Sequence, residues 1–151
     1  MDESSLAVFR SRHMGIVFQQ FHLISTLTAL ENVSLPLEIS RQENAKERAT
    51  EALDKVGLGK RMQHFPSQMS GGECQRVAIA RAFVTQPAII LADEPSGNLD
   101  SKTGSSVMDL LFSLAENKNT TLILVTHSNE LAKKCRHAYL LEDGMLKSVQ
   151  L

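Results

Sequence analysis

The chain has 151 residues, 42% of them hydrophobic and 22% charged, which is typical of one globular domain with a core of its own. Its formal net charge of -1 excludes the basic surface that nucleic-acid-binding proteins carry, so no nucleic-acid partner is expected. The charged N-terminal segment predicts no signal peptide. Since no uncharged apolar run approaches the ~20 residues of a membrane helix, any membrane association should be peripheral.

The first elements predicted along the chain are a strand and a helix. Residues 13–20 form a short apolar run that fits a strand. Residues 26–39 open with a Thr28-x-x-Glu31 capping box, which satisfies free amides at a helix N-terminus. Pro36 predicts a break in this helix, because proline removes one helical hydrogen bond.

Two more helices are expected before the middle of the chain. In residues 42–56, alanine, leucine and valine recur on one helical face, and Gly57 ends the pattern. Residues 75–84 follow a pair of glycines and predict a helix with little polar surface. No strand pattern occurs in residues 26–69, so this region is expected to be a helical insertion.

The second half of the chain alternates strands and helices. Residues 87–95 and 120–127 are continuous apolar runs, which predict strands buried on both faces. Residues 104–116 predict an amphipathic helix between them, and residues 129–136 a short helix after them. A terminal hairpin is expected to turn at Asp143-Gly144. This alternation predicts an α/β fold with a parallel sheet.

Two adjacent acids, Asp93 and Glu94, end one of the apolar strands. The carboxyl edge of such a sheet is where α/β folds bind ligands. One carboxylate can hold a metal through water, and the other can orient or deprotonate a water molecule. The alternative interpretation is a surface turn that happens to be acidic.

Ser70, Gly71 and Gly72 precede a helix. Glycines let backbone amides approach a phosphate closely, and a helix N-terminus adds partial positive charge there. The alternative is a plain N-cap, which would explain the serine but not two successive glycines.

Five motifs in order along the chain resemble the ATP-binding domain of ABC transporters. VFQQF is similar to the Q-loop, MSGGE to the signature motif, ILADE to Walker B, SGNLD to the D-loop and TH to the switch-histidine loop. The stretch FQQFHLISTLTALENVSLPL is most similar to the branch that contains lipoprotein-release and macrolide-efflux ATPases, particularly YbbA-like subunits.

The resemblance implies a partial P-loop NTPase (RecA-like) fold. This is an α/β parallel sheet with an inserted helical subdomain, here lacking the N-terminal strands and the P-loop. Residues 1–25 would be a remnant of the N-terminal core with the Q-loop. Residues 26–75 would be the helical subdomain with the signature motif, and residues 76–151 the C-terminal half of the core.

The resemblance also implies ATP and Mg²⁺ as cofactors and gives each motif residue a role. Asp93 would bind the magnesium through water, and Gln19 would contact the metal or the attacking water. Glu94 would be the general base, and His127 would touch the γ-phosphate.

Two partners are implied by the same resemblance. A second ATP-binding subunit would receive the signature motif at its nucleotide and would meet Asp100 at the dimer interface. The signature residues are Ser70, Gly71, Gly72 and Glu73. A transmembrane permease subunit would dock between Phe21 and Leu37, which places the chain on the cytoplasmic face of the inner membrane.

The phosphate-binding motif G-x-x-x-x-G-K-[ST] does not occur in the sequence. In the family it lies upstream of the Q-loop, and only eighteen residues precede Gln19 here. We therefore expect Met1 to be an internal methionine of a longer cassette, and residues 120–127 to form an exposed apolar edge. Three interpretations remain: a partial ATPase subunit, a catalytically dead interaction module that offers its signature motif to a complete partner, or a nonfunctional remnant.

Two weaker features concern cysteines. Cys74 stands where the family usually has a polar residue; an inert thiol is expected, although a helix start would lower its pKa. Cys135 and His137 could form half of a metal site, but no further ligands are evident for the four that zinc requires.

Overall fold

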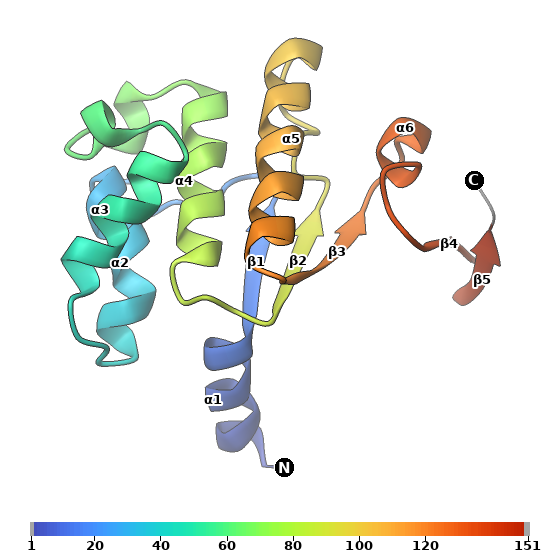
Figure 1. Cartoon of the computed structure of the whole chain (residues 1–151), viewed down its shortest axis with the longest axis horizontal. Coiled ribbons are helices and arrows are strands. Elements are labelled where there is room, and N and C mark those ends of the chain that lie inside the picture. Colours follow the sequence, from blue (N-terminus) through green and yellow to red (C-terminus); the bar gives the residue numbers. More distant parts are fainter. Residues whose placement is uncertain (1, 150–151) are drawn as a thin grey trace.

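The computed structural model describes residues 2–149 and arranges them as a small sheet flanked by helices (Figure 1). The helices are α1 (Glu3–His13), α2 (Ala29–Ile39), α3 (Ala45–Lys55), α4 (Gly71–Phe83), α5 (Ser101–Asn117) and α6 (Asn129–Ala132). The strands are β1 (Met14–Phe18), β2 (Ile89–Asp93), β3 (Thr121–Val125), β4 (Ala138–Glu142) and β5 (Met145–Val149). Two short 3₁₀ turns, η1 (Gly59–Arg61) and η2 (Pro66–Gln68), lie between α3 and α4.

The first three strands form a parallel sheet in the order β1-β2-β3, which confirms the predicted fold class. Val17, Ala92 and Leu124 lie side by side in its register. Because all three strands run in the same direction, the residues that follow them gather at one edge of the sheet.

The prediction that residues 87–95 and 120–127 form strands buried on both faces is wrong. Burial alternates along β2, where Ile90 and Ala92 are buried against residues of α4 and α5. In β3, Ile123 is 49% exposed and Val125 58% exposed. Within the described residues β3 has a strand neighbour on one side only, so the expected exposed apolar edge is confirmed.

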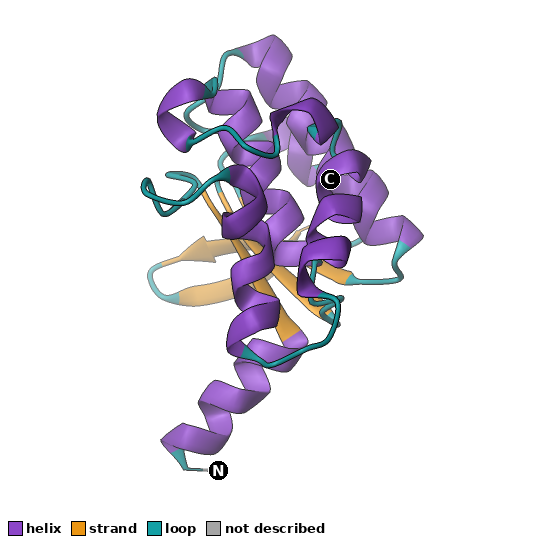
Figure 2. Cartoon of the chain, turned by 90° about the vertical axis from the view of Figure 1, so that its left-hand side faces the viewer, coloured by secondary structure: helices purple, strands orange, loops and turns teal. Residues whose placement is uncertain are grey.

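Residues 26–69 contain helices and no strand, as the sequence predicted, and α2, α3 and the two 3₁₀ turns form one layer. Figure 2 shows this layer in front of the sheet. The Thr28–Glu31 capping box is present: the Glu31 amide donates to Thr28 Oγ1 at 3.2 Å, and the Thr28 amide donates to Glu31 Oε2 at 2.8 Å.

Pro36 does not break α2, contrary to the sequence prediction. The helix continues to Ile39, so only its last turn follows the proline and only one helical hydrogen bond is forgone. Ser40 caps the helix end: its hydroxyl and its amide both donate to the carbonyl of Pro36, at 2.7 and 3.2 Å.

Helix α4 is shared by two hydrophobic clusters, which explains its low polar surface. Val77 and Ala80 pack in the cluster formed with α2 and α3. Ile79 and Phe83 pack in the cluster formed with the sheet and α5. A movement of α4 therefore has to be shared by the helical layer and by the sheet.

The C-terminal elements differ in part from the prediction. The hairpin β4–β5 is confirmed, with Asp143 and Gly144 in the left-handed conformations that a tight type I′ turn requires (φ 49° and 75°). Helix α6 ends at Ala132 rather than at residue 136. Among residues 2–149, no helix has the length and apolar character to cross a membrane.

Candidate functional site

The carboxyl ends of β1, β2 and β3 bring four predicted site residues to one edge of the sheet. Gln19 follows β1, Asp93 is the last residue of β2 with Glu94 directly after it, and His127 follows β3 by two residues. The register pairs Phe18 with Asp93 and Asp93 with Val125, so the three segments leave the sheet at the same level. This edge is where the sequence placed a ligand site.

Glu94 and His127 form the tightest polar pair at this edge. Glu94 Oε1 accepts one hydrogen bond from the backbone amide of His127 at 2.8 Å and lies 2.7 Å from His127 Nδ1. Since the carboxylate is an acceptor, Nδ1 carries a proton in this arrangement. The imidazole is 84% exposed, whereas the carboxylate side chain is 22% exposed. A partly sheltered carboxylate thus orients an accessible imidazole.

The backbone at Glu94 is held in an unusual conformation. Its φ is +43°, a left-handed value that only a minority of non-glycine residues adopt. Two backbone bonds fix it: the Glu94 amide donates to Val125 O at 3.0 Å, and the Gly97 amide donates to Glu94 O at 2.9 Å. The turn after β2 is therefore tied to β3, which directs the Glu94 carboxylate toward His127.

Gln19 is bonded to the segment that follows Glu94. Its Nε2 donates to Asn98 Oδ1 at 3.1 Å, and Asn98 Nδ2 donates to Gln19 O at 3.1 Å. Gly97 lies against the same side chain, and a Cβ there would be 2.6 Å from Gln19 Nε2. The bond uses the amide nitrogen of Gln19, so the amide oxygen is the atom that could contact a cation.

The donors at this edge fit a magnesium ion. Among residues 2–149 no group of three or more His, Cys, Asp and Glu side chains forms a metal cage. Mg²⁺ does not need one, since it commonly binds through one or two carboxylates, substrate phosphates and several waters. Asp93 is exposed at the end of β2, and with the amide oxygen of Gln19 it offers the hard oxygen ligands that this ion prefers.

Ser70 and Glu73 cap the N-terminus of α4. The Glu73 amide donates to Ser70 Oγ at 3.3 Å, and the Ser70 amide donates to Glu73 Oε2 at 2.8 Å. That second bond, from the Ser70 amide, is the main cause that lowers the pKa of Glu73. Arg61 Nε lies 3.1 Å from Glu73 Oε1 and adds to the effect. The N-cap interpretation of Ser70 therefore holds, whatever else this segment binds.

The two glycines after Ser70 have different surroundings. Gly72 is buried, and a Cβ there would collide with Thr103 Cγ2 on α5. Gly71 is exposed, and a Cβ there would come within 3.3 Å of Leu99 Cδ2. Close packing of α4 on α5 thus accounts for Gly72, while Gly71 leaves the backbone at the start of α4 open to solvent.

Asp100 lies in a separate place from the Glu94–His127 pair and caps α5. Its Oδ1 accepts from the Thr103 amide at 3.0 Å. Hydrogen bonds from Thr103 lower the pKa of Asp100, whose side chain is at the surface.

Three residues that sequence reasoning missed hold this region together. Gln75 is fully buried on α4, and its Nε2 donates to Pro95 O at 2.7 Å and to Phe18 O at 3.3 Å. Arg81, also on α4, donates to the carbonyls of the loop after β1, and Asn98 bonds Gln19 as described. The available signal was a glutamine and an arginine in a helix whose other polar side chains are only Glu73 and Arg76.

The pKa of the Cys74 thiol differs from what the sequence suggested. Burial, with a smaller contribution from the nearby Glu73, raises the pKa of the Cys74 thiol, so the suggestion that a helix start lowers it is wrong. Burial also raises the pKa of Cys135. Both are free thiols, and the described residues give Cys135 and His137 no further metal ligands.

Comparison with known proteins shows which family the sequence of this chain matches. The family model described as "ABC transporter" matches residues 3–97. An uncharacterized ABC transporter ATP-binding protein, YbbA of Escherichia coli K12, is 51% identical over 149 residues, which are 97% of this chain and 65% of YbbA. MJ1508 of Methanocaldococcus jannaschii, with the same description, is 50% identical over 99% of this chain and 67% of its own length.

A relative from a named lipoprotein-releasing system and a relative of known structure match the same chain. The lipoprotein-releasing system ATP-binding protein LolD of Alcanivorax borkumensis is 49% identical over 91% of this chain and 61% of its own length. The ATP-binding cassette MJ0796, in a dimeric post-hydrolysis state bound to ADP and Pi, superimposes with a TM-score of 0.84 at 42% identity. The match covers 99% of this chain and 68% of that structure. The chain thus spans about two thirds of the length of the proteins it matches.

Proposed function

Because the chain belongs to the ATP-binding subunits of ABC transporters, we propose that it forms part of a cassette that binds ATP and Mg²⁺ and couples ATP hydrolysis to transport. The observation that carries the proposal is the Glu94–His127 pair beside Asp93 at the carboxyl edge of the sheet. Such an edge suits phosphoryl transfer, which depends mainly on positioning and on electrostatic stabilisation.

Each residue of the pair has a chemical task in this proposal. Glu94 accepts a hydrogen bond from the attacking water and directs its lone pair at the γ-phosphorus. The bond from Nδ1 to Glu94 fixes the imidazole of His127, and its other ring nitrogen, when it also carries a proton, would donate to a γ-phosphate oxygen. Asp93 and the amide oxygen of Gln19 would hold Mg²⁺, which neutralises charge on the phosphates when bound.

The triphosphate itself needs a further set of donors. The sequence contains no G-x-x-x-x-G-K-[ST], the loop whose amides and lysine hold the β- and γ-phosphates. We propose that a loop of this kind from outside the 151 residues completes the nucleotide site. Without it, Glu94 and His127 have no positioned phosphate to act on.

The remaining motif residues fit the role of partner contacts. Ser70 and Gly71 are exposed at the start of α4, where a nucleotide held by a second ATP-binding subunit could meet them with Gly72 and Glu73. We propose that Asp100 lies at that dimer interface and that a permease subunit docks between Phe21 and Leu37. The cassette would then work at the cytoplasmic face of the inner membrane, in export or in extraction from it.

Hydrolysis by a chimeric cassette tests the catalytic assignment. An N-terminal segment that carries the motif G-x-x-x-x-G-K-[ST], joined upstream of these residues, would supply the phosphate loop. We expect the chimera to hydrolyse ATP. Glu94→Gln should lower kcat at least about a hundredfold while ATP binding is kept, because it removes the proton acceptor but not the phosphate contacts.

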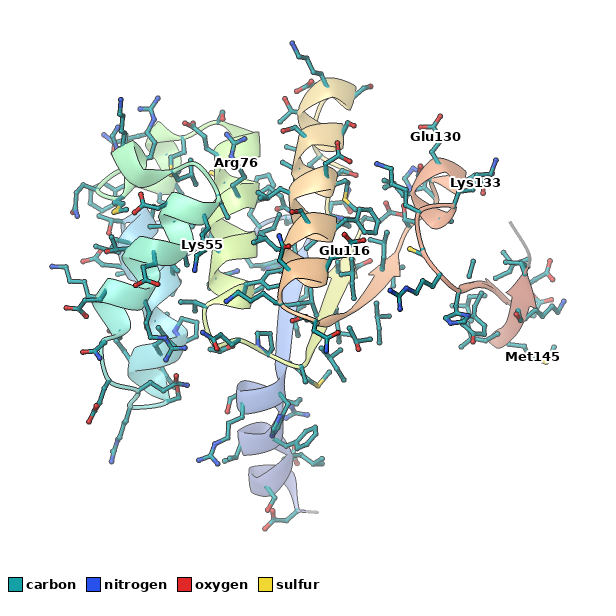
Figure 3. The ribbon with its side chains drawn as sticks, in the orientation of Figure 1. Lys55, Arg76, Glu116, Glu130, Lys133 and Met145 are labelled. Carbon is teal, nitrogen blue, oxygen red and sulfur yellow. The ribbon has the colours of Figure 1, made fainter. Side chains whose placement is uncertain are left out.

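Glu116→Gln is the matched control for this substitution. Glu116 is an exposed carboxylate near the C-terminal end of α5, the end that leads to the start of β3 and lies away from the site (Figure 3). The proposal would be wrong if the chimera bound ATP and Glu94→Gln hydrolysed it as fast as the Glu116→Gln protein.

A further inference from the structure

Gln75 is a fully buried polar side chain that links three elements of the molecule. It lies on α4, five residues after the Ser70 cap, with no exposed surface. Its Nε2 donates to Phe18 O, at the end of β1, and to Pro95 O, two residues after the end of β2. One amide group therefore joins the signature helix to the two loops that carry Gln19 and Glu94.

The orientation of this amide follows from its partners. Both neighbours are backbone carbonyls, which are acceptors, so the nitrogen rather than the oxygen must face them. The opposite atom, Gln75 Oε1, is buried and has no hydrogen-bond partner among the described residues. The two bonds that Nε2 donates are therefore the polar contacts through which this glutamine connects α4 to the sheet.

Both loops that Gln75 holds contain non-glycine residues with a left-handed backbone. Glu94, next to Pro95, has a φ of +43°, and the residues three and four positions after Phe18, Phe21 and His22, have φ values of 60° and 47°. Arg81, further along α4, donates to the carbonyls of these two residues at 2.8 and 2.6 Å. Helix α4 is thus bonded to the end of β1, to the first part of the loop that follows it, and to the loop after β2.

We propose that Gln75 is a positioning residue that transmits the placement of α4 to Gln19 and Glu94. When a partner's nucleotide meets the start of α4, the shift of the helix would reach the Phe18 and Pro95 carbonyls through this one amide. The Glu94 carboxylate would move with it. The functional meaning rests on the proposed ATPase role, but the linkage itself is a property of the isolated chain.

Amide hydrogen exchange in the purified 151-residue chain tests the linkage without nucleotide. Three backbone amides in the loops after β1, β2 and β3 serve as reporters. Phe21 N donates to Phe18 O, Gly97 N to Glu94 O, and His127 N to Glu94 Oε1. Gln75→Met keeps the length of the side chain and removes its donors. We expect the protection factors of the three reporters to fall about tenfold or more.

Control amides separate positioning from general loss of stability. Leu58 N, which donates to Leu53 O in the helical layer, should keep its protection in Gln75→Met. Unchanged protection at Phe21, Gly97 and His127 would overturn the proposal. An equal fall at the reporters and at Leu58 would also overturn it, because Gln75 would then be an ordinary core residue.

Gln75→Glu gives a pH signature that a packing role would not give, and it decides the matter if Gln75→Met does not fold. Where the introduced group is ionised, its carboxylate would face two carbonyls and leave them without a donor. Burial raises the pKa of a glutamate, to about 8–9 at fully buried positions, so near pH 5 its protonated oxygen can donate to Pro95 O. We expect reporter protection to be lost near pH 10 and regained near pH 5. The same protection at both pH values, or its loss at both, would contradict the proposal.

Discussion

Individual carboxylates near the site have different jobs despite their similar chemistry. Glu73 and Asp100 cap helices and have lowered pKa values because of the hydrogen bonds they accept. Glu94 instead faces the His127 side chain and its backbone amide. The environment of each carboxylate, rather than its residue type, makes Glu73 and Asp100 helix caps and leaves Glu94 available for the chemical role that we propose for it.

Acid should remove the contribution of Glu73 to stability. Its pKa is below the ordinary 4.5 in the folded chain, so the stabilisation is present above that value and is lost as the pH falls through the folded pKa. Glu73→Gln should lower the free energy of unfolding by about 1 kcal/mol at pH 7 and by much less at pH 3.

Urea unfolding at the two pH values, with the exposed Glu51→Gln as control, measures this difference. A loss of the same size at pH 3 and pH 7 would show that the charge of Glu73 does not support α4.

Sequence motifs pointed to the candidate site residues, but not to the residues that hold them in position. Asp93, Glu94 and His127 could be placed because each stands at the end of an apolar run that reads as a strand. Gln75 could not, since helical periodicity says which face it lies on but not that two strand-end carbonyls lie within reach of it. Such contacts depend on how elements far apart in the chain pack together.

Among the elements, α4 connects most of the fold, and its contact with α5 is close at Gly72. A Cβ at Gly72 would collide with Thr103 Cγ2, and the helix cannot move away without disturbing its two hydrophobic clusters. Gly72→Ala should therefore lower the free energy of unfolding by about 1–3 kcal/mol, the usual cost of overpacking.

Thr103→Ser tests the cause of that loss, because it removes the colliding methyl group and keeps the backbone amide that Asp100 caps. The double variant should recover part of the stability in urea unfolding. If Gly72→Ala costs nothing, or if Thr103→Ser gives no recovery beyond its own effect, the close contact is not what requires glycine there.

The sequence predicted most of the helices and strands, but not which of their faces are buried. Strand and helix periodicities are local, so the parallel sheet, the capped α2 and the hairpin turn followed from the sequence. Burial of β3 did not, because a continuous apolar run reports what a strand could bury and not what covers it. Pro36 likewise lies within α2, where only the last turn follows it and one helical hydrogen bond is forgone.

At the scale of the whole molecule, the chain carries the proposed site acids and histidine on a three-stranded sheet whose β3 edge is apolar and exposed. Its relatives are about half as long again as this chain, which aligns with about two thirds of their length. The central claim is that these 151 residues position a catalytic carboxylate but do not themselves hold a triphosphate.

Isothermal titration calorimetry of the purified chain with ATP and Mg²⁺ tests that claim most directly. Amides and a lysine of a phosphate loop supply most of the grip on the β- and γ-phosphates, so we expect no measurable heat of binding from this chain alone. A micromolar Kd for ATP would contradict the account, because it would mean that donors other than such a loop hold the phosphates.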